Sequence, residues 1–209
     1  MFVFVIAVVL IVAAVVVIVV ARRQANDSWI PKAVAGGLGA LGLALLPLQV
    51  FYVQDPGEAS VKVAFGYITG INTEQGPQPK APWEDIISYS IRSQKIEMFS
   101  NDGGNGENGT AITAPLAGGA NASVSITVLY SIKPDAVSDI YSRFRTQDLL
   151  LGNALEPSLR DVVRKESAKY QPLQIKQQRA DLGNGILAAL LAWEDEYGVI
   201  VDQVNLGDI

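Results

Sequence analysis

Residues 1–21 read MFVFVIAVVLIVAAVVVIVVA, an apolar run without a single charged side chain. An α-helix rises about 1.5 Å per residue, so roughly 20 residues cross the ~30 Å hydrocarbon core of a bilayer. A cleaved signal peptide is the alternative, but no basic residue precedes the run, and the run is longer than a usual signal core. The stretch therefore predicts a transmembrane helix.

A second uncharged run covers residues 33–53 and is rich in glycine and alanine. Small residues let helices in lipid approach each other closely. We expect two spans or a membrane hairpin, with one span plus an interfacial segment as the alternative. The connector, residues 22–32, carries three basic side chains and one acidic side chain. Because basic loops tend to stay cytoplasmic, we expect the chain after the connector on the non-cytoplasmic side of a bacterial inner membrane or its equivalent.

The rest of the chain, residues 54–209, carries 13 basic and 20 acidic side chains, a net charge of −7. A surface of this sign repels phosphate backbones, so we expect no nucleic-acid partner. Cysteine and histidine are absent, which excludes Cys/His zinc sites and Ser-His-Asp or Cys-His catalysis. We therefore expect no catalytic, cofactor or metal site. A Ser-Lys hydrolase stays open, although no spacing singles out a pair.

Hydrophobic periodicity in this part predicts strands first, then helices, then one closing strand. The predicted strands are residues 61–65, 67–69, 87–91, 123–132 and 199–206. The predicted helices are residues 137–144, 148–163 and 173–197. Prolines within residues 74–82 favour a loop there, and Pro157 is expected to kink or split the second helix. This order of elements indicates an α+β fold.

Residues 100–121 are rich in glycine and asparagine and contain Gly104-x-Gly106-x-x-Gly109, the spacing of a dinucleotide fingerprint. That fingerprint needs a helix start directly after it, because the helix N-terminus binds the pyrophosphate. Residues 110–115 provide no such start. We interpret the segment as a long hairpin connection without a nucleotide site.

Several short motifs follow one another in a fixed order along residues 54–209. They include Pro56-Gly57-Glu58, Ala81-Pro82-Trp83, Leu155-x-Pro157-x-x-Arg160 and Tyr197-Gly198-Val199. In this order they resemble the SPFH domain of stomatins, prohibitins, flotillins and the bacterial HflK and HflC proteins. The resemblance implies a two-part fold, with a β-rich SPFH1-like subdomain over residues 54–133 and an α/β SPFH2-like subdomain over residues 134–209.

The same resemblance implies a function and a set of partners. Many copies would pack side by side into a ring or cage, either a homo-oligomer or a hetero-oligomer with a paralogue, and would organise a membrane microdomain. The implied partners are membrane lipids and further copies of the chain. Some relatives associate with membrane proteases, so an accessory or regulatory protease subunit is the alternative function. A long coiled coil normally follows the domain in this family.

Two groups of charged residues are the candidates for the contact between subunits. The basic cluster consists of Arg160, Arg164, Lys165 and Lys169, and the acidic run consists of Glu194, Asp195 and Glu196. A head-to-tail contact between the basic cluster of one copy and the acidic run of the next would repeat and close into a ring. Exposed pairs contribute only about 0–1 kcal/mol each, so they would set the register while apolar contacts supply the affinity.

Overall fold

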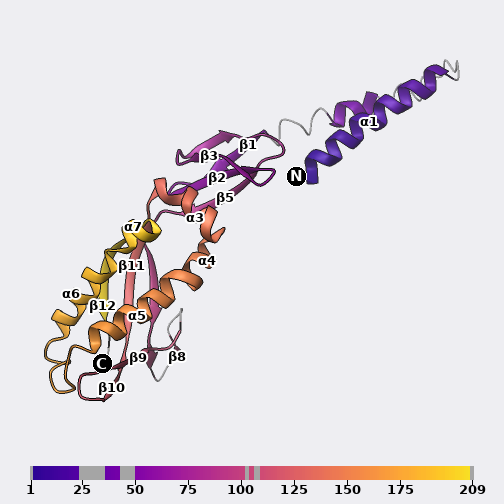
Figure 1. Ribbon diagram of the computed structural model, residues 1–209. Helices are drawn as coiled ribbons and strands as arrows, with labels where there is room; N and C mark the ends of the chain where they lie inside the picture. The colour runs from indigo at the N-terminus through magenta and orange to yellow at the C-terminus, as the bar shows by residue number, and fades with distance from the viewer. Residues whose placement is uncertain (1, 24–35, 43–49, 102–103, 106–108, 208–209) are drawn as a thin grey trace. The chain divides into compact units, whose positions relative to one another are not determined.

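The computed structural model describes the chain except for residues 1, 24–35, 43–49, 102–103, 106–108 and 208–209. The chain forms two compact units (Figure 1). Unit 1 comprises Met1–Pro56 and Ser60–Ile87, and unit 2 comprises Gly57–Ala59 and Ser88–Ile209. Strands and helices are combined as the sequence indicated, which confirms the α+β class. The subdomain boundary predicted after residue 133 stays a prediction.

Helix α1 occupies Phe2–Arg23 and is 22 residues long. Residues 36–42 are helical too, and they lie beside α1, since a Cβ atom at Gly39 would be 3.7 Å from the Cβ of Ala14. Small residues at this point let the two helical segments approach each other closely, as expected for the glycine- and alanine-rich residues 33–53. In the part of the chain whose side chains the structure describes, no helix combines the length and apolar character needed to cross a membrane. Helix α1 includes the first two residues of the predicted connector, Arg22 and Arg23, whereas the remaining connector residues, 24–32, and residues 43–49 lie outside the described residues.

The strands of unit 1 form two sheets. In the first, β1 (Phe51–Gln54) pairs antiparallel with β4 (Gly76–Pro79). The second contains three strands in the order β3-β2-β5, namely Tyr67–Asn72, Glu58–Ala64 and Asp85–Ser90. The second membrane segment was predicted to extend to residue 53. Residues 51–53 belong to strand β1, so the predicted segment was too long at its C-terminal end.

Strand β4 also corrects the prediction of a loop over residues 74–82. Pro77 and Pro79 lie opposite Val53 and Phe51, two positions apart along the strand. In an antiparallel pair, alternate residues leave their N–H pointing away from the partner, and β4 pairs with no second strand among the described residues. Proline is tolerated on such an edge because the missing N–H is not needed there.

A buried polar network joins the two sheets of unit 1. The Ser60 hydroxyl donates to Gln54 Oε1 at 2.6 Å and lies 3.0 Å from the Tyr52 hydroxyl. Asn72 Nδ2 donates to the same Tyr52 hydroxyl at 3.0 Å. Ser60 is fully buried and Gln54 is 2% exposed, so these hydrogen bonds offset the cost of removing the polar groups from water.

Unit 2 is built on an antiparallel sheet in the order β12-β11-β6 (Figure 1). These strands span Val199–Leu206, Ile126–Ile132 and Gln94–Met98. Along β11 the burial alternates strictly, with Ile126, Val128, Tyr130 and Ile132 buried. This is the face that the sequence predicted to be apolar. The predicted strand 123–132 is, however, interrupted at residue 125. Its first part belongs to β10 (Asn121–Val124), which pairs with β9 (Ile112–Pro115) and not with the strands of this sheet. Two short strands, β7 (Ser100–Asn101) and β8 (Gly104–Asn105), pair within the predicted loop.

The helical part of unit 2 follows β11. Its elements are η2 (Pro134–Ala136), α3 (Val137–Phe144), α4 (Gln147–Leu150), η3 (Leu151–Leu155), α5 (Glu156–Ser167), α6 (Arg179–Leu190) and α7 (Trp193–Tyr197). Helix α3 has the predicted bounds. The predicted third helix, residues 173–197, is two helices, and its first six residues are turns. Helix α5 packs against β9 and α6, and α6 packs against β12.

The helix over residues 147–167 continues through Pro157 by means of a π turn. The proline lacks an N–H, and its ring conflicts with the carbonyl of Asn153 one turn earlier. The turn widens there, so that Glu156 N–H donates to the Leu151 carbonyl five residues back. The predicted disturbance at Pro157 is thus a π-helical segment, which neither ends the helix nor divides it. The helix begins at the Thr146 cap, whose hydroxyl accepts from Leu149 N–H, slightly before the predicted start at residue 148.

Candidate functional site

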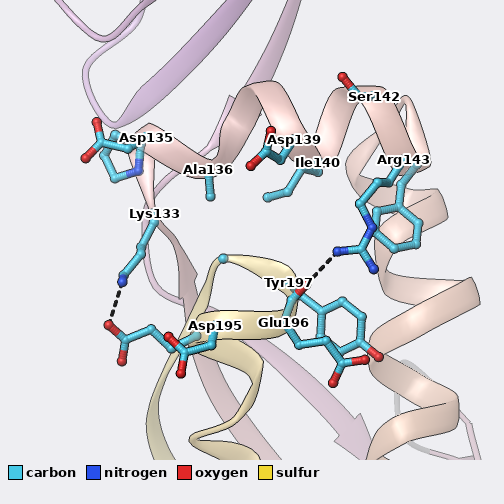
Figure 2. Close-up of a pocket in the computed structure, with 14 residues that line it drawn as sticks. Lys133, Asp135, Ala136, Asp139, Ile140, Ser142, Arg143, Asp195, Glu196 and Tyr197 are labelled. Atoms are coloured by element: carbon cyan, nitrogen blue, oxygen red, sulfur yellow. Dashed lines mark hydrogen bonds and ion pairs between the residues drawn. The ribbon is translucent and has the colours of Figure 1, made fainter.

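A pocket of about 570 Å³ lies in unit 2 between α3 and α7 (Figure 2). Helix α3 and the turn before it form one side, and α7 with the glycine after it forms the other. The apolar lining includes Ala136 and Ile140, and Ile140 is 2% exposed. Charged side chains surround this apolar part.

The two sides of the pocket are held together by the ends of strands β11 and β12. Ile132 pairs with Val199 in the antiparallel register, and Lys133 N–H donates to the Gly198 carbonyl at 3.0 Å. The sheet therefore brings the start of η2 next to the end of α7, although about 60 residues separate them in the sequence. Gly198 caps α7 in the left-handed conformation, with φ of +68°.

Two polar contacts cross the pocket. Lys133 Nζ lies 2.6 Å from Glu194 Oε1, and Arg143 Nη1 donates to the Glu196 carbonyl at 2.5 Å (Figure 2). The Arg143 guanidinium also stands over the ring of Tyr197, 5.5 Å from its centroid, which is a cation–π geometry. These contacts fix α7 against α3.

The charge around the pocket is predominantly negative. Five carboxylates line it, against two cations, Lys133 and Arg143. Among the residues that the structure describes, no hydrogen bond or ion pair reaches the exposed side chains of Asp135, Asp139 or Asp195. Burial raises the pKa of the Tyr197 phenol, and the neighbouring Glu196 carboxylate raises it further, so the phenol stays neutral at physiological pH.

The two cations of the pocket already contact α7, and the rest of its charge comes from five carboxylates. The chain has no histidine or cysteine, so the usual proton-transfer and nucleophilic groups at neutral pH are missing. Within the described ranges of the chain, no group of three or more carboxylates is arranged to hold a metal ion. The predominantly acidic lining favours a cationic group over an anionic one at this pocket.

The structure places the predicted charged residues on separate elements of unit 2. Arg160, Arg164 and Lys165 lie on α5 and Lys169 lies just beyond it, whereas Glu194, Asp195 and Glu196 all lie on α7 at the pocket. Within the basic cluster, Lys165 pairs with Asp161 at 2.6 Å and Lys169 pairs with Glu166 at 2.7 Å. Arg164 is exposed, and its Nε donates to the Thr113 carbonyl at 3.3 Å.

The sequence singled out Glu194, Asp195 and Glu196 only as a subunit contact, which stays a prediction, and it gave no indication of the opposite side of the pocket, which carries Lys133, Asp135, Asp139 and Arg143. No local signal links these residues to the acidic run. The link is the pairing of β11 with β12, which depends on the tertiary fold.

Comparison with known proteins supplies the family. The chain matches the SPFH domain / Band 7 family over residues 52–209. No curated protein matches it significantly. The match spans both the strands of unit 1 and the whole of unit 2, and it confirms the resemblance drawn from the short motifs. The chain therefore belongs to the SPFH domain / Band 7 family.

Proposed function

We propose that the chain is a membrane-anchored scaffold of the prohibitin/stomatin type, whose copies associate side by side and organise a membrane microdomain. SPFH proteins are generally membrane-associated and are generally non-enzymatic scaffolds. The observation that carries the proposal is the family match over residues 52–209, which covers nearly all of the chain after the apolar segments.

The apolar segments at the N-terminus would form the anchor. Helix α1 is 22 residues long, which corresponds to about 33 Å, close to the thickness of the hydrocarbon core. The contact between Gly39 and Ala14 is of the kind by which helices pack in lipid. With the basic connector on the cytoplasmic side, both folded units would lie on the other side of the membrane.

The lateral contact would join the basic cluster of one copy to the α3–α7 pocket of the next. Lys165 and Lys169 already have acidic partners on their own chain. Arg164 is exposed with one long hydrogen bond, and Asp195 is exposed without an ion pair among the described residues. Charge complementarity therefore favours Arg164 against Asp195 as the pair that sets the register between copies.

A charge exchange tests this contact. Arg164→Glu and Asp195→Lys should each shrink the assembly in mild detergent, measured by mass photometry, because each places like charges opposite one another. The double variant restores the attraction and should recover at least half of the wild-type mass. Lys176→Glu is the matched control, because it makes the same charge change at an exposed position in the α5–α6 connection and should leave the mass unchanged.

Two outcomes would count against different parts of the proposal. Full-size assemblies of Arg164→Glu would show that the contact is placed wrongly. A wild-type chain that stays monomeric at micromolar concentration would contradict the scaffold itself.

A further inference from the structure

Exposed aromatic side chains are confined to unit 1. Four aromatic side chains there are exposed: Phe51 by 58%, Phe65 by 80%, Tyr67 by 77% and Trp83 by 46%. In unit 2, every aromatic side chain that the structure describes is buried or half-buried. Single exposed apolar residues are ordinary on protein surfaces, but a set of large aromatic rings on one unit alone indicates a surface that meets an apolar partner.

The two most exposed rings are at the tip of the β2–β3 hairpin. Ala64 pairs with Tyr67, which leaves Phe65 and Gly66 as the two-residue turn. Both turn residues have positive φ, +51° for Phe65 and +85° for Gly66. Such a turn favours asparagine or aspartate before glycine, because other side chains are strained at positive φ.

Phenylalanine is therefore an unfavourable residue for this turn, and it buries little of its surface against the fold. It occupies a strained backbone position, and 80% of its surface is in solvent. Around the tip, a Cβ atom at Gly66 would meet no described atom within 4 Å, so no described part of the chain covers that side of the turn. Strain retained at an uncovered position points to a role in binding.

The chemistry of the tip fits the interfacial region of a bilayer better than a protein surface. Two rings on a narrow turn are too small for a stable protein interface, which buries about 800 Å² on each partner. A phenyl ring beside a phenol fits a boundary where one end of the group is apolar and the other is wet. The net negative charge of residues 54–209 gives no general attraction to anionic lipid, so a contact with the bilayer would have to be apolar.

We propose that the β2–β3 hairpin inserts Phe65 and Tyr67 into the headgroup region of the membrane, as a second contact separate from the N-terminal apolar segments. The inference rests on the proposed membrane anchoring. It assigns an interaction surface to unit 1, and it does not depend on whether the copies form a ring.

Single-cysteine labelling tests the insertion directly, because the chain has no cysteine of its own. Phe65→Cys is labelled with a nitrobenzoxadiazole dye in the full chain, reconstituted in phosphatidylcholine vesicles. Leu173→Cys is the matched control, since Leu173 is 88% exposed but lies in unit 2. With lipids spin-labelled near the headgroup, we expect at least threefold stronger quenching at position 65 than at position 173.

A second variant distinguishes a loss of membrane contact from a loss of folding. Asparagine tolerates positive φ, so Phe65→Asn should fold at least as well as the wild type while removing the ring. A dye on Tyr67→Cys should lose at least half of its lipid quenching in the Phe65→Asn background.

The possible results distinguish this inference from the proposed function. Equal quenching at positions 65 and 173 would overturn the inserted hairpin. A blue-shifted dye at position 65 without lipid quenching would also overturn it, because the apolar partner would then be protein. Failure of the chain to float with the vesicles would instead reject the anchoring proposal, and a monomeric chain with strong quenching at position 65 would reject only the scaffold.

Discussion

Gly198 faces Ala136 so closely that a Cβ atom at position 198 would overlap the methyl group of Ala136. Gly198 ends α7, and Ala136 precedes α3, so this contact sets the spacing between the two sides of the pocket. The left-handed φ of Gly198, +68°, adds a second requirement for glycine. The pocket therefore depends on a residue without a side chain at the point where β12 begins.

Replacing Gly198 by alanine should destabilise unit 2 through both effects. We expect roughly 1–2 kcal/mol from the left-handed backbone and about 1–3 kcal/mol more from overpacking against Ala136. Urea unfolding followed by tryptophan fluorescence would measure the loss. The double variant Gly198→Ala/Ala136→Gly should recover only the overpacking part, and an unchanged unfolding free energy for Gly198→Ala would contradict the contact.

The buried indole of Trp193 donates to the Ser158 hydroxyl at 2.8 Å. Because Trp193 is 1% exposed, Ser158→Ala would leave a buried N–H without its acceptor. We expect a loss of about 1–3 kcal/mol in the free energy of unfolding. Ser142→Ala is the control, because the Ser142 hydroxyl is exposed and bonds to the backbone of its own helix, and it should change stability by less than about 0.5 kcal/mol.

Alkaline pH should weaken the fold through Tyr89. Burial raises the pKa of this phenol to about 12, with a smaller contribution from Tyr141, and its hydroxyl donates to the Arg145 carbonyl at 2.7 Å. An unfolded tyrosine has a pKa near 10. Between about pH 10 and pH 12 the unfolded chain loses the proton while the folded chain keeps it, so the phenol's contribution is complete below pH 10 and is lost as the pH rises.

The expected slope is about 1.4 kcal/mol of unfolding free energy per pH unit for this one group. Urea titrations at closely spaced pH values from 8 to 12 would measure it. Tyr89→Phe should be less stable at pH 8 and should have a flatter decline above pH 10. An equal slope in the wild type and the variant would show that Tyr89 does not cause the alkaline loss.

The side of the membrane on which the folded units lie can be tested at an exposed position in unit 1. Gln75→Cys introduces the only thiol in the chain at an exposed residue, whereas Ser60 is fully buried and would not react. With the basic connector inside, a membrane-impermeant maleimide should label position 75 in intact cells from which the outer barrier has been removed. Labelling that requires lysis of the inner membrane would place the folded units in the cytoplasm.

Local sequence patterns predicted the elements whose causes are local. The alternation along β11 follows from one buried and one less buried face. Helix α3 follows from apolar residues at helical spacing, and the predicted end of the last helix at residue 197 agrees with the end of α7 before Gly198. At these positions the physics acts within a few residues of the chain.

The failures arise where distant segments decide the outcome. Strand β4 was predicted as a loop because its prolines were judged alone, and pairing with β1 on one edge makes them acceptable. The acidic run was singled out as a subunit contact, but Lys133 and Arg143 opposite it were not noticed, because only the β11–β12 register brings them near α7. Periodicity contains no information on which strands pair across some 60 residues.

Lateral assembly in the membrane is the central claim, and electron microscopy tests it most directly. The chain would be extracted from membranes in a mild detergent, reconstituted into lipid nanodiscs large enough for several copies, and imaged in negative stain. The account predicts closed rings of one diameter, lost in Arg164→Glu and regained in the Arg164→Glu/Asp195→Lys double variant. A uniform population of single copies or dimers in the wild type, at the same lipid composition and concentration, would contradict it.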